Sequence, residues 1–340
     1  GRQIVLTSGT TGVPKSAHRP TPKGFGTIAS VLSRMPLQMG EPMMIAAPLF
    51  HTWGLAALQI STPLRAKVVL QDRFDAESCL RAIAAHRCTS LFAAPVMLQR
   101  IMDLPAHVRA RYDTSSLKVV AVSGSAPSAQ LVTDFMDAYG DVLYSFYGST
   151  EVSWATVADP ADLRAAPATA GYPPLGTTVR ILGCGDKVLP RGAVGRIFVG
   201  NDMLFDGYAG VAAPKMVDSL METGDLGYVD ADGRLFVIGR DDEMVISGGE
   251  NVYPRPVEEA LSHLPMVRDV AVVGVPDHEF GQRLAAFVVP ADGARMDPET
   301  IRNFVNHRLS RFAVPRDVVF LNALPRNATG KVLKAQLGTM

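Results

Sequence analysis

A loop rich in glycine and hydroxyl groups begins only a few residues into the chain. The apolar residues 4–6 before it predict the end of a short buried strand, and two glycines then interrupt any regular structure. Glycine lets successive backbone N–H groups turn toward one anion, while hydroxyls and a lysine add donors and a positive charge. The ligand that fits is a polyphosphate. The loop residues are Thr7, Ser8, Gly9, Thr10, Thr11, Gly12 and Lys15.

The same residues also fit a solvated surface loop that binds nothing. They do not form the Walker pattern, because Gly9 and Gly12 are three positions apart and Lys15 does not follow a glycine. On its own, the loop therefore indicates phosphate binding without identifying an enzyme.

Two further stretches carry a carboxylate close to glycine. The stretch YSFYGSTE (144–151) ends in Glu151, whose carboxylate could hold a metal ion that bridges phosphate oxygens. The stretch ETGDLGYVDADG (222–233) places Asp225 between two glycines, a setting suited to the two hydroxyls of a ribose. The alternatives are a polar turn after a strand and a hairpin turn with a capping aspartate. Each stretch alone fits both interpretations.

Two more stretches lie nearer the C-terminus. GRDDEMVISGGENVYP (239–254) is dense in charge and glycine, and by itself it fits an exposed linker between domains. LPRNATGKVLK (324–334) places Lys331 directly after a glycine, but Pro325 stands where the first glycine of a Walker match would be. Taken singly, Lys331 fits a solvated side chain.

The composition limits the class of protein. A chain of 340 residues that is 47% hydrophobic predicts about two globular domains of roughly 150 residues. Lysine plus arginine and aspartate plus glutamate both number 33, so nothing indicates a nucleic-acid partner. Three widely spaced cysteines indicate a reducing compartment, and we expect a cytoplasmic protein. The uncharged stretch 42–64 is broken by prolines, which favours a buried strand–turn–helix over a transmembrane segment.

The elements that must position these residues alternate along the first half of the chain. Residues 118–122 predict a strand and 129–139 a helix, and Asp75 predicts the start of another helix. This alternation is typical of a doubly wound α/β sheet, whose ligands lie beyond the carboxyl ends of the strands. From about Gly171, short strands between turns predict a small β-barrel or twisted sheet. After Gly239, a compact α+β unit of about a hundred residues follows.

Taken together and in order, the motifs resemble those of one family. The chain is similar to the adenylate-forming superfamily of acyl- and aryl-CoA synthetases, luciferases and peptide-synthetase adenylation domains. The motifs that carry the resemblance are TSGTTGVPK, YGSTE, TGD, GRDDEMVISGGENVYP and PRNATGK. The resemblance implies a large AMP-binding domain over residues 1–241 and a small mobile lid domain over 242–340. Because family members carry a further stretch before the first motif, we expect that the N-terminal part of the large domain is missing.

The resemblance also implies roles for single residues. The loop from Thr7 to Lys15 would cover the phosphates of ATP, Thr150 would meet phosphate, and Glu151 would hold Mg²⁺. His51 would border the acyl pocket. The adenine and ribose would be bound by Gly124, Ser125, Ala126, Tyr147, Gly148, Asp225 and Arg240.

In the second domain, the resemblance makes Asp242 the hinge about which the lid turns. Gly248 and Gly249 would let the pantetheine arm of CoA approach the backbone, and Lys331 would be the catalytic lysine. Ser16 and Glu243 depart from the residues common in the family at their positions, but neither removes a charge that the chemistry needs.

The function implied is that of an acid–thiol ligase that uses ATP, Mg²⁺ and CoA. It would activate a carboxylic acid to an acyl-adenylate and transfer the acyl group to CoA, with release of AMP and pyrophosphate. The apolar stretch 43–61 favours a medium- or long-chain fatty acid over an aryl acid. Two alternatives stay open: an enzyme that delivers the acyl group to a carrier protein, and a truncated, non-catalytic fragment. The sequence leaves the oligomeric state undetermined.

Overall fold

The computed structural model describes residues 3–8, 14–19, 26–205, 207–208, 214–247, 249–327 and 330–339. The contacts between residues divide the chain into two compact units. The larger unit comprises Gly1–Pro127, Leu131–Thr223 and Tyr228–Phe236, and the smaller one Ser128–Gln130, Gly224–Gly227 and Val237–Met340. The domain boundary between residues 241 and 242 stays a prediction.

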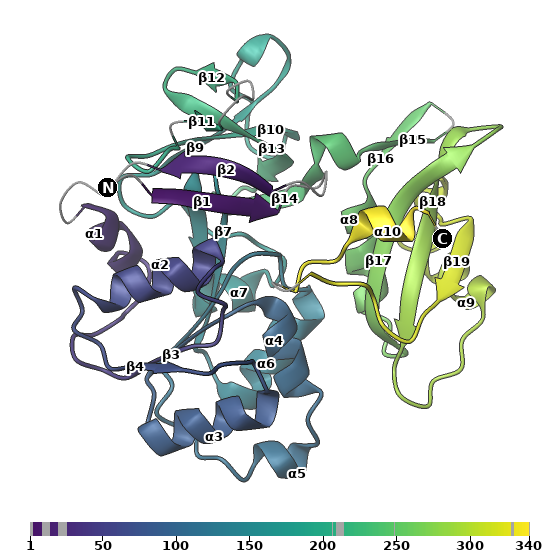
Figure 1. Ribbon diagram of the computed structural model, residues 1–340. Helices are drawn as coiled ribbons and strands as arrows, with labels where there is room; N and C mark the ends of the chain where they lie inside the picture. Colours follow the sequence, from purple (N-terminus) through teal and green to yellow (C-terminus); the bar gives the residue numbers. More distant parts are fainter. Residues whose placement is uncertain are drawn as a thin grey trace. The chain divides into compact units, whose positions relative to one another are not determined.

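A six-stranded sheet forms the centre of the larger unit (Figure 1). Its strands run in the order β4-β3-β5-β6-β7-β8, and all neighbouring pairs are parallel except β7 with β8. This confirms the doubly wound α/β sheet expected from the sequence. The strands are β3 (Met43–Ile45), β4 (Val68–Leu70), β5 (Ser90–Ala93), β6 (Val119–Val122), β7 (Leu143–Ser149) and β8 (Ser153–Ala158).

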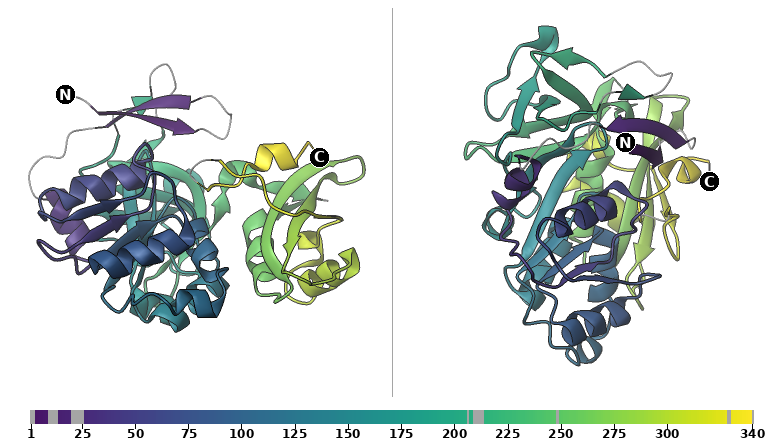
Figure 2. Two further views of the ribbon diagram at one scale, coloured as in Figure 1. Left: turned by 60° about the horizontal axis from the view of Figure 1, so that its bottom comes forward. Right: turned by 60° about the vertical axis from the view of Figure 1, so that its left-hand side comes forward.

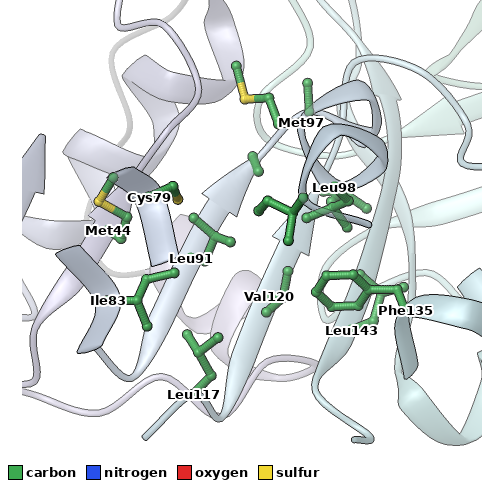
Figure 3. Close-up of a cluster of buried hydrophobic side chains, with 14 of the residues drawn as sticks. Met44, Cys79, Ile83, Leu91, Met97, Leu98, Leu117, Val120, Phe135 and Leu143 are labelled. Atoms are coloured by element: carbon green, nitrogen blue, oxygen red, sulfur yellow. The ribbon is translucent and has the colours of Figure 1, made fainter. Parts of the chain in front are cut away.

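Helices cover both faces of this sheet because side chains alternate along each strand. Met44 joins one apolar cluster with α3, α4 and α6, while Met43 and Ile45 join a second cluster with α1 and α2. Figure 3 shows the first cluster, in which Leu91 and Val120 face Ile83 and Phe135. The helices are α1 (Gly26–Leu32), α2 (Thr52–Ser61), α3 (Ala76–His86), α4 (Pro95–Met102), α5 (Ala106–Arg109), α6 (Ala129–Tyr139) and α7 (Pro160–Ala165).

Local sequence signals set the ends of two of these helices. The carboxylate of Asp75 accepts a hydrogen bond from the Ser78 N–H at 2.8 Å, which confirms it as the N-cap of α3. Helix α6 covers the predicted residues 129–139, and Gly140 follows it with a φ of 85°.

Cys79 of α3 lies inside the apolar cluster that Figure 3 shows. Burial there raises the pKa of its thiol to about 12.

Short strands build the β-rich part of the larger unit, as the sequence predicts. One sheet has the order β12-β13-β10-β9, with β14 paired to β13, and a second has the order β1-β2-β11. The first comprises β9 (Thr178–Leu182), β10 (Gly195–Gly200), β12 (Met216–Val217), β13 (Leu220–Val229) and β14 (Leu235–Arg240), with the 3₁₀ turn η1 (Cys184–Asp186). Residues 224–227 of β13 and 237–240 of β14 belong to the smaller unit. The second comprises β1 (Gln3–Ser8), β2 (Pro14–Arg19) and β11 (Gly207–Tyr208).

The smaller unit is an α+β fold, as the sequence predicts. Its sheet has the order β16-β15-β18-β17, with β19 paired to β18. Its strands are β15 (Val245–Ser247), β16 (Glu250–Val252), β17 (Val267–Asp277), β18 (Gly281–Pro290) and β19 (Asp317–Phe320). Its helices are α8 (Pro254–Ser262), α9 (Pro298–Asn306) and α10 (Lys334–Leu337), with the 3₁₀ turns η2 (Asp241–Glu243) and η3 (Arg311–Ala313).

Apolar side chains form two clusters on opposite faces of the smaller unit's sheet. Figure 2 shows the strands and helices of this unit from two further sides. Val272 of β17 packs on one face with α8 and α9, while its neighbours Ala271 and Val273 pack on the other face with Leu324 and Leu337. The C-terminal segment is therefore fixed to the sheet by its own apolar side chains. No helix in the described part of the chain is long and apolar enough to cross a membrane.

Candidate active site

The central sheet changes its direction of winding at β3. The chain passes from β3 to β4 on one side and then returns to β5 on the other, and both pairs are parallel. The backbone N–H groups of Ala46 and Ala47, just after β3, bind the Phe92 carbonyl at the end of β5 at 2.9 and 3.0 Å. In open α/β sheets such a switch point is where ligands bind. The segment that follows leads to His51.

His51 is the N-cap of α2. Its Nδ1 accepts a hydrogen bond from the Trp53 N–H at 3.3 Å, so the ring carries its proton on Nε2. Burial lowers the pKa of His51, which favours the neutral ring. A Cβ built on Gly124 would lie 3.6 Å from the His51 Cε1. The predicted acyl-pocket residue and the first predicted adenine residue therefore lie side by side.

Trp53 fixes the start of α2 against the sheet, a role that no local sequence pattern indicates. Its indole N–H donates to the Ala93 carbonyl at 3.0 Å, and its ring lies 5.4 Å from that of Phe92 and 5.0 Å from that of Phe146. The three rings belong to the buried apolar cluster that lies between the sheet and α2. A tryptophan in an apolar stretch is indistinguishable by sequence from an ordinary core residue.

The predicted adenine residues follow β6 and end β7, which are neighbouring strands. Ser123, at the end of β6, donates its hydroxyl to the Phe146 carbonyl at 3.2 Å. The turn after Ser123 is exposed, as a ligand-binding turn must be, and Tyr147 donates its hydroxyl to Thr223 Oγ1 at 3.4 Å. This exposed turn contains Gly124, Ser125 and Ala126.

The sequence predicts that the stretch with the YGSTE motif follows a strand. In the structure, the first three residues of the motif belong to strand β7 itself. The strand pairs with β8 through an irregular register between Tyr147 and Gly148, and this allows the glycine to stay within the ladder. The Ser149 hydroxyl oxygen accepts from the N–H of Glu151 at 3.2 Å. Thr150 and Glu151 are both half-buried in this tight turn.

The turn fits the mode in which Mg²⁺ is bound next to phosphates. Mg²⁺ keeps several waters and takes one or two protein carboxylates together with substrate oxygens. Among the described residues, no three His, Cys, Asp or Glu side chains gather as a separate metal cage. Glu151 alone, fixed through its backbone to Ser149 and to the Phe205 N–H at 2.8 Å, matches a site that is completed by substrate.

In the smaller unit, three predicted residues form one charged group. The Arg240 guanidinium lies 3.7 Å from the Asp225 carboxylate and 3.1 Å from that of Asp242. Gly224 has a φ of 76°, and a Cβ there would lie 3.1 Å from the guanidinium nitrogens. Asp225 lies inside β13, whereas the end of this stretch does form a hairpin turn between β13 and β14, in which the Asp230 carboxylate accepts from the Arg234 N–H at 2.8 Å.

Lys331 is exposed on a tightly bonded turn. The Asn327 side chain accepts from the Lys331 N–H at 2.9 Å, and the Lys331 carbonyl accepts from the Asn327 N–H at 2.9 Å. Arg326 donates to the Gly330 carbonyl at 2.6 Å and pairs with Asp269 of β17 at 2.7 Å. The backbone that carries Lys331 is thus held on the sheet while its ammonium faces solvent.

The structure describes only the backbone of three residues of the predicted phosphate loop. Thr7 and Ser8 lie in strand β1 and Lys15 lies in strand β2, where the sequence predicts a loop, and Thr7 is paired with Lys15. Gly249 has a φ of 85°, which suits a glycine. The residues that fall outside the described part of the chain are Gly9, Thr10, Thr11, Gly12 and Gly248.

The parallel sheet with this carboxyl edge and the small α+β unit with its exposed lysine turn fit the adenylate-forming enzyme that the sequence motifs predict. Comparison with protein families agrees: residues 3–209 match the AMP-binding enzyme family and residues 256–331 match the AMP-binding enzyme C-terminal domain. The chain belongs to the AMP-binding enzyme family, within its CoA-ligase branch, and the prediction of an AMP-forming acid–thiol ligase is confirmed.

Individual relatives refine this assignment. The chain is 36% identical to a feruloyl-CoA synthase of Amycolatopsis sp, with 98% of the chain and 68% of that protein covered. It is 34% identical to an indoleacetate–CoA ligase of Aromatoleum aromaticum, with 97% and 65% covered. Among solved structures, the amide bond synthetase McbA from Marinactinospora thermotolerans is 33% identical with a TM-score of 0.89, over 99% of this chain and 68% of that one.

These similarities agree with a small carboxylic acid, ATP and CoA as the reactants. The requirement for Mg²⁺, the cytoplasmic location and the role of each site residue stay predictions. The fatty-acid substrate expected from the apolar stretch 43–61 finds no support in the two ligases named above, whose names refer to ferulate and indoleacetate.

Proposed function

We propose that this protein activates a ring-bearing carboxylic acid with ATP to an acyl-adenylate and then transfers the acyl group to CoA. The observation that carries the proposal is the place of His51 beside Gly124, at the carboxyl edge of the sheet next to its switch point. The residues expected to border the acid and the adenine are neighbours there. The acid's carboxylate and the α-phosphate can then be brought within reacting distance.

The chemistry needs positive charge because both reactants are anions. Attack of the carboxylate on the α-phosphorus forms a new P–O bond and releases pyrophosphate, so negative charge must be neutralised at that point. Lys331 would supply an ammonium for this step, and Glu151 would hold the metal ion. Mg²⁺, when bound, would neutralise charge on the phosphate oxygens. Rotation at Asp242 then replaces the lysine turn by the segment of Gly248 and Gly249 and admits CoA.

The acid class is inferred from the names of two relatives. Trp53, Phe92 and Phe146 do not contribute to it, because they are 8%, 0% and 6% exposed and their ring contacts with one another are core packing. The names of the feruloyl-CoA synthase and the indoleacetate–CoA ligase support a planar acid over a fatty acid.

A second candidate function is supported by the similarity to the amide bond synthetase, which has 33% identity. In that case the acyl-adenylate would form in the same way, but an amine and not a thiol would accept the acyl group. A carrier protein with a phosphopantetheine thiol is a third acceptor. All three share the first half-reaction, so only the acceptor distinguishes them.

A panel of acids and acceptors tests the proposal. Ferulate, indoleacetate, octanoate and acetate are each supplied with ATP and Mg²⁺, and AMP release is measured with CoA, with a simple amine or with a phosphopantetheinyl carrier protein. We expect AMP release with an aromatic acid and CoA, and an acyl-CoA product by mass spectrometry. AMP release only with octanoate would contradict the acid class. An amide product without a thioester would favour the second candidate, and no acid-dependent AMP release would refute the ligase function.

A further inference from the structure

A lysine other than Lys331 forms a charged group inside the smaller unit. The Lys334 ammonium lies 2.9 Å from the Glu243 carboxylate and 3.2 Å from that of Glu258. All three side chains are partly buried, with exposed fractions of 29% for Lys334, 32% for Glu243 and 21% for Glu258. One ammonium thus lies between two carboxylates that are far from it in the sequence.

The three residues come from three different elements. Lys334 is the first residue of α10, Glu243 is the last residue of η2, and Glu258 lies in α8. The Glu258 carboxylate also accepts the N–H of Val272 at 2.8 Å, so it is anchored to β17. Through Glu258, the group is connected to the centre of the sheet.

Both ends of this group adjoin residues with proposed functions. Lys334 stands three positions after Lys331, and the backbone between them returns to the turn through the Leu333 N–H, which donates to the Pro325 carbonyl at 2.8 Å. Glu243 follows the proposed hinge residue Asp242 directly, and the two side chains have different partners. Asp242 pairs with Arg240, whereas Glu243 pairs with Lys334.

We propose that Lys334 is a positioning residue that holds the Lys331 turn in a fixed place relative to the chain just after Asp242. This inference rests on the proposed function. The short helix α10 has only four residues, so its place depends on tertiary contacts such as the burial of Leu337 and the pairing of Lys334. Residues from Glu243 onward then move as one body with Lys331, and rotation is confined to Asp242 and the residues before it.

The loss of the Lys334 ammonium would act on Lys331 in two ways. Glu243 and Glu258 would repel each other once the cation between them is removed, because both approach the same ammonium. The Lys331 turn would also lose one of its attachments. A displacement of about 1 Å at a catalytic group lowers a rate by up to about a hundredfold, so a partial loss of about tenfold is expected here.

The test separates the two half-reactions in the variant Lys334→Met. Adenylate formation is measured by acid-dependent ATP–pyrophosphate exchange, and thioester formation is measured from preformed acyl-adenylate and CoA. We expect exchange to fall about tenfold, while thioester formation stays within about twofold. Lys334→Arg, which keeps the charge, should restore most of the exchange. Glu243→Gln should slow exchange by about threefold and provides a second test if the methionine variant does not fold.

Two controls distinguish the possible failures. Lys118→Met removes a lysine that pairs with Glu41 at 2.6 Å in the larger unit, and it should change neither half-reaction. Equal losses in both half-reactions of Lys334→Met, or normal exchange in it and in Glu243→Gln, would overturn the positioning role alone. Absence of acid-dependent exchange in the unchanged protein would instead refute the proposed function, and this inference with it.

Discussion

Gly148 lies so close to Ser153 that a Cβ built on Gly148 would be 1.9 Å from the Ser153 carbonyl oxygen. Ser153 itself has a φ of 62°, so the turn between β7 and β8 has little freedom to move away. Gly148 is therefore required by the backbone of the YGSTE turn, in addition to any role beside the adenine. A larger residue would displace the turn that carries Thr150 and Glu151.

We predict that Gly148→Ala lowers the free energy of unfolding by about 2 kcal/mol, as expected for forced overpacking. Urea denaturation of the variant and the unchanged protein measures the difference. Gly26→Ala is the control, because a Cβ there meets no described atom within 4 Å, and its effect should stay within about 0.5 kcal/mol. Equal stability of the two variants would show that the turn can relax.

His51 gives a prediction about pH. Burial lowers its pKa below the ordinary value of 6.5, so the unfolded chain binds more protons than the folded one just below that pH. The neutral ring makes its full contribution to stability above pH 6.5. This contribution is lost as the pH falls toward the pKa of His51 in the folded state. Protonation would also remove the Nδ1 acceptor that caps α2.

The variant His51→Asn tests this dependence, since asparagine can cap a helix but does not titrate. Between about pH 7.5 and about pH 5.5, the unchanged protein should lose more stability in urea than the variant does. The same loss in both proteins would mean that His51 is not the group responsible. An NMR titration of the His51 ring offers a direct check of the lowered pKa.

Arg240 should contribute to the binding of ATP more than to the chemical step. A contact with the ribose is made equally in the ground state and in the transition state, so its loss raises KM and leaves kcat nearly unchanged. We expect Arg240→Ala to raise the KM for ATP by about tenfold with kcat within about twofold. Arg234→Ala is the control, because Arg234 pairs with Asp230 at 2.9 Å in a hairpin. A fall in kcat with KM unchanged would refute the ribose role.

The sequence was sufficient where short-range signals determine structure. The spacing of apolar residues predicted α6 to the residue, and Asp75 marked the start of α3, because caps and helical periodicity depend on neighbours in the chain. The ordered motifs predicted the family for the same reason, since each motif is a local pattern. They also indicated His51 and Gly124, which the fold brings together.

The sequence was insufficient where distant residues determine structure. Glycines at the phosphate loop and in YGSTE indicated loops, but strand pairing continues through Ser8 and Gly148 because their partners come from the following strand. Trp53 and Lys334 carried no signal of their roles. Their partners stand 40 and 91 residues away, respectively, and only the fold makes them neighbours.

The central claim is that Lys331 serves the formation of the acyl-adenylate. The measurement that tests it most directly is acid-dependent exchange of labelled pyrophosphate into ATP by the Lys331→Ala variant. We predict that exchange falls by about a hundredfold or more, while ATP affinity and thioester formation from preformed acyl-adenylate are largely retained. Exchange at the rate of the unchanged protein, or equal losses in both half-reactions, would contradict the account.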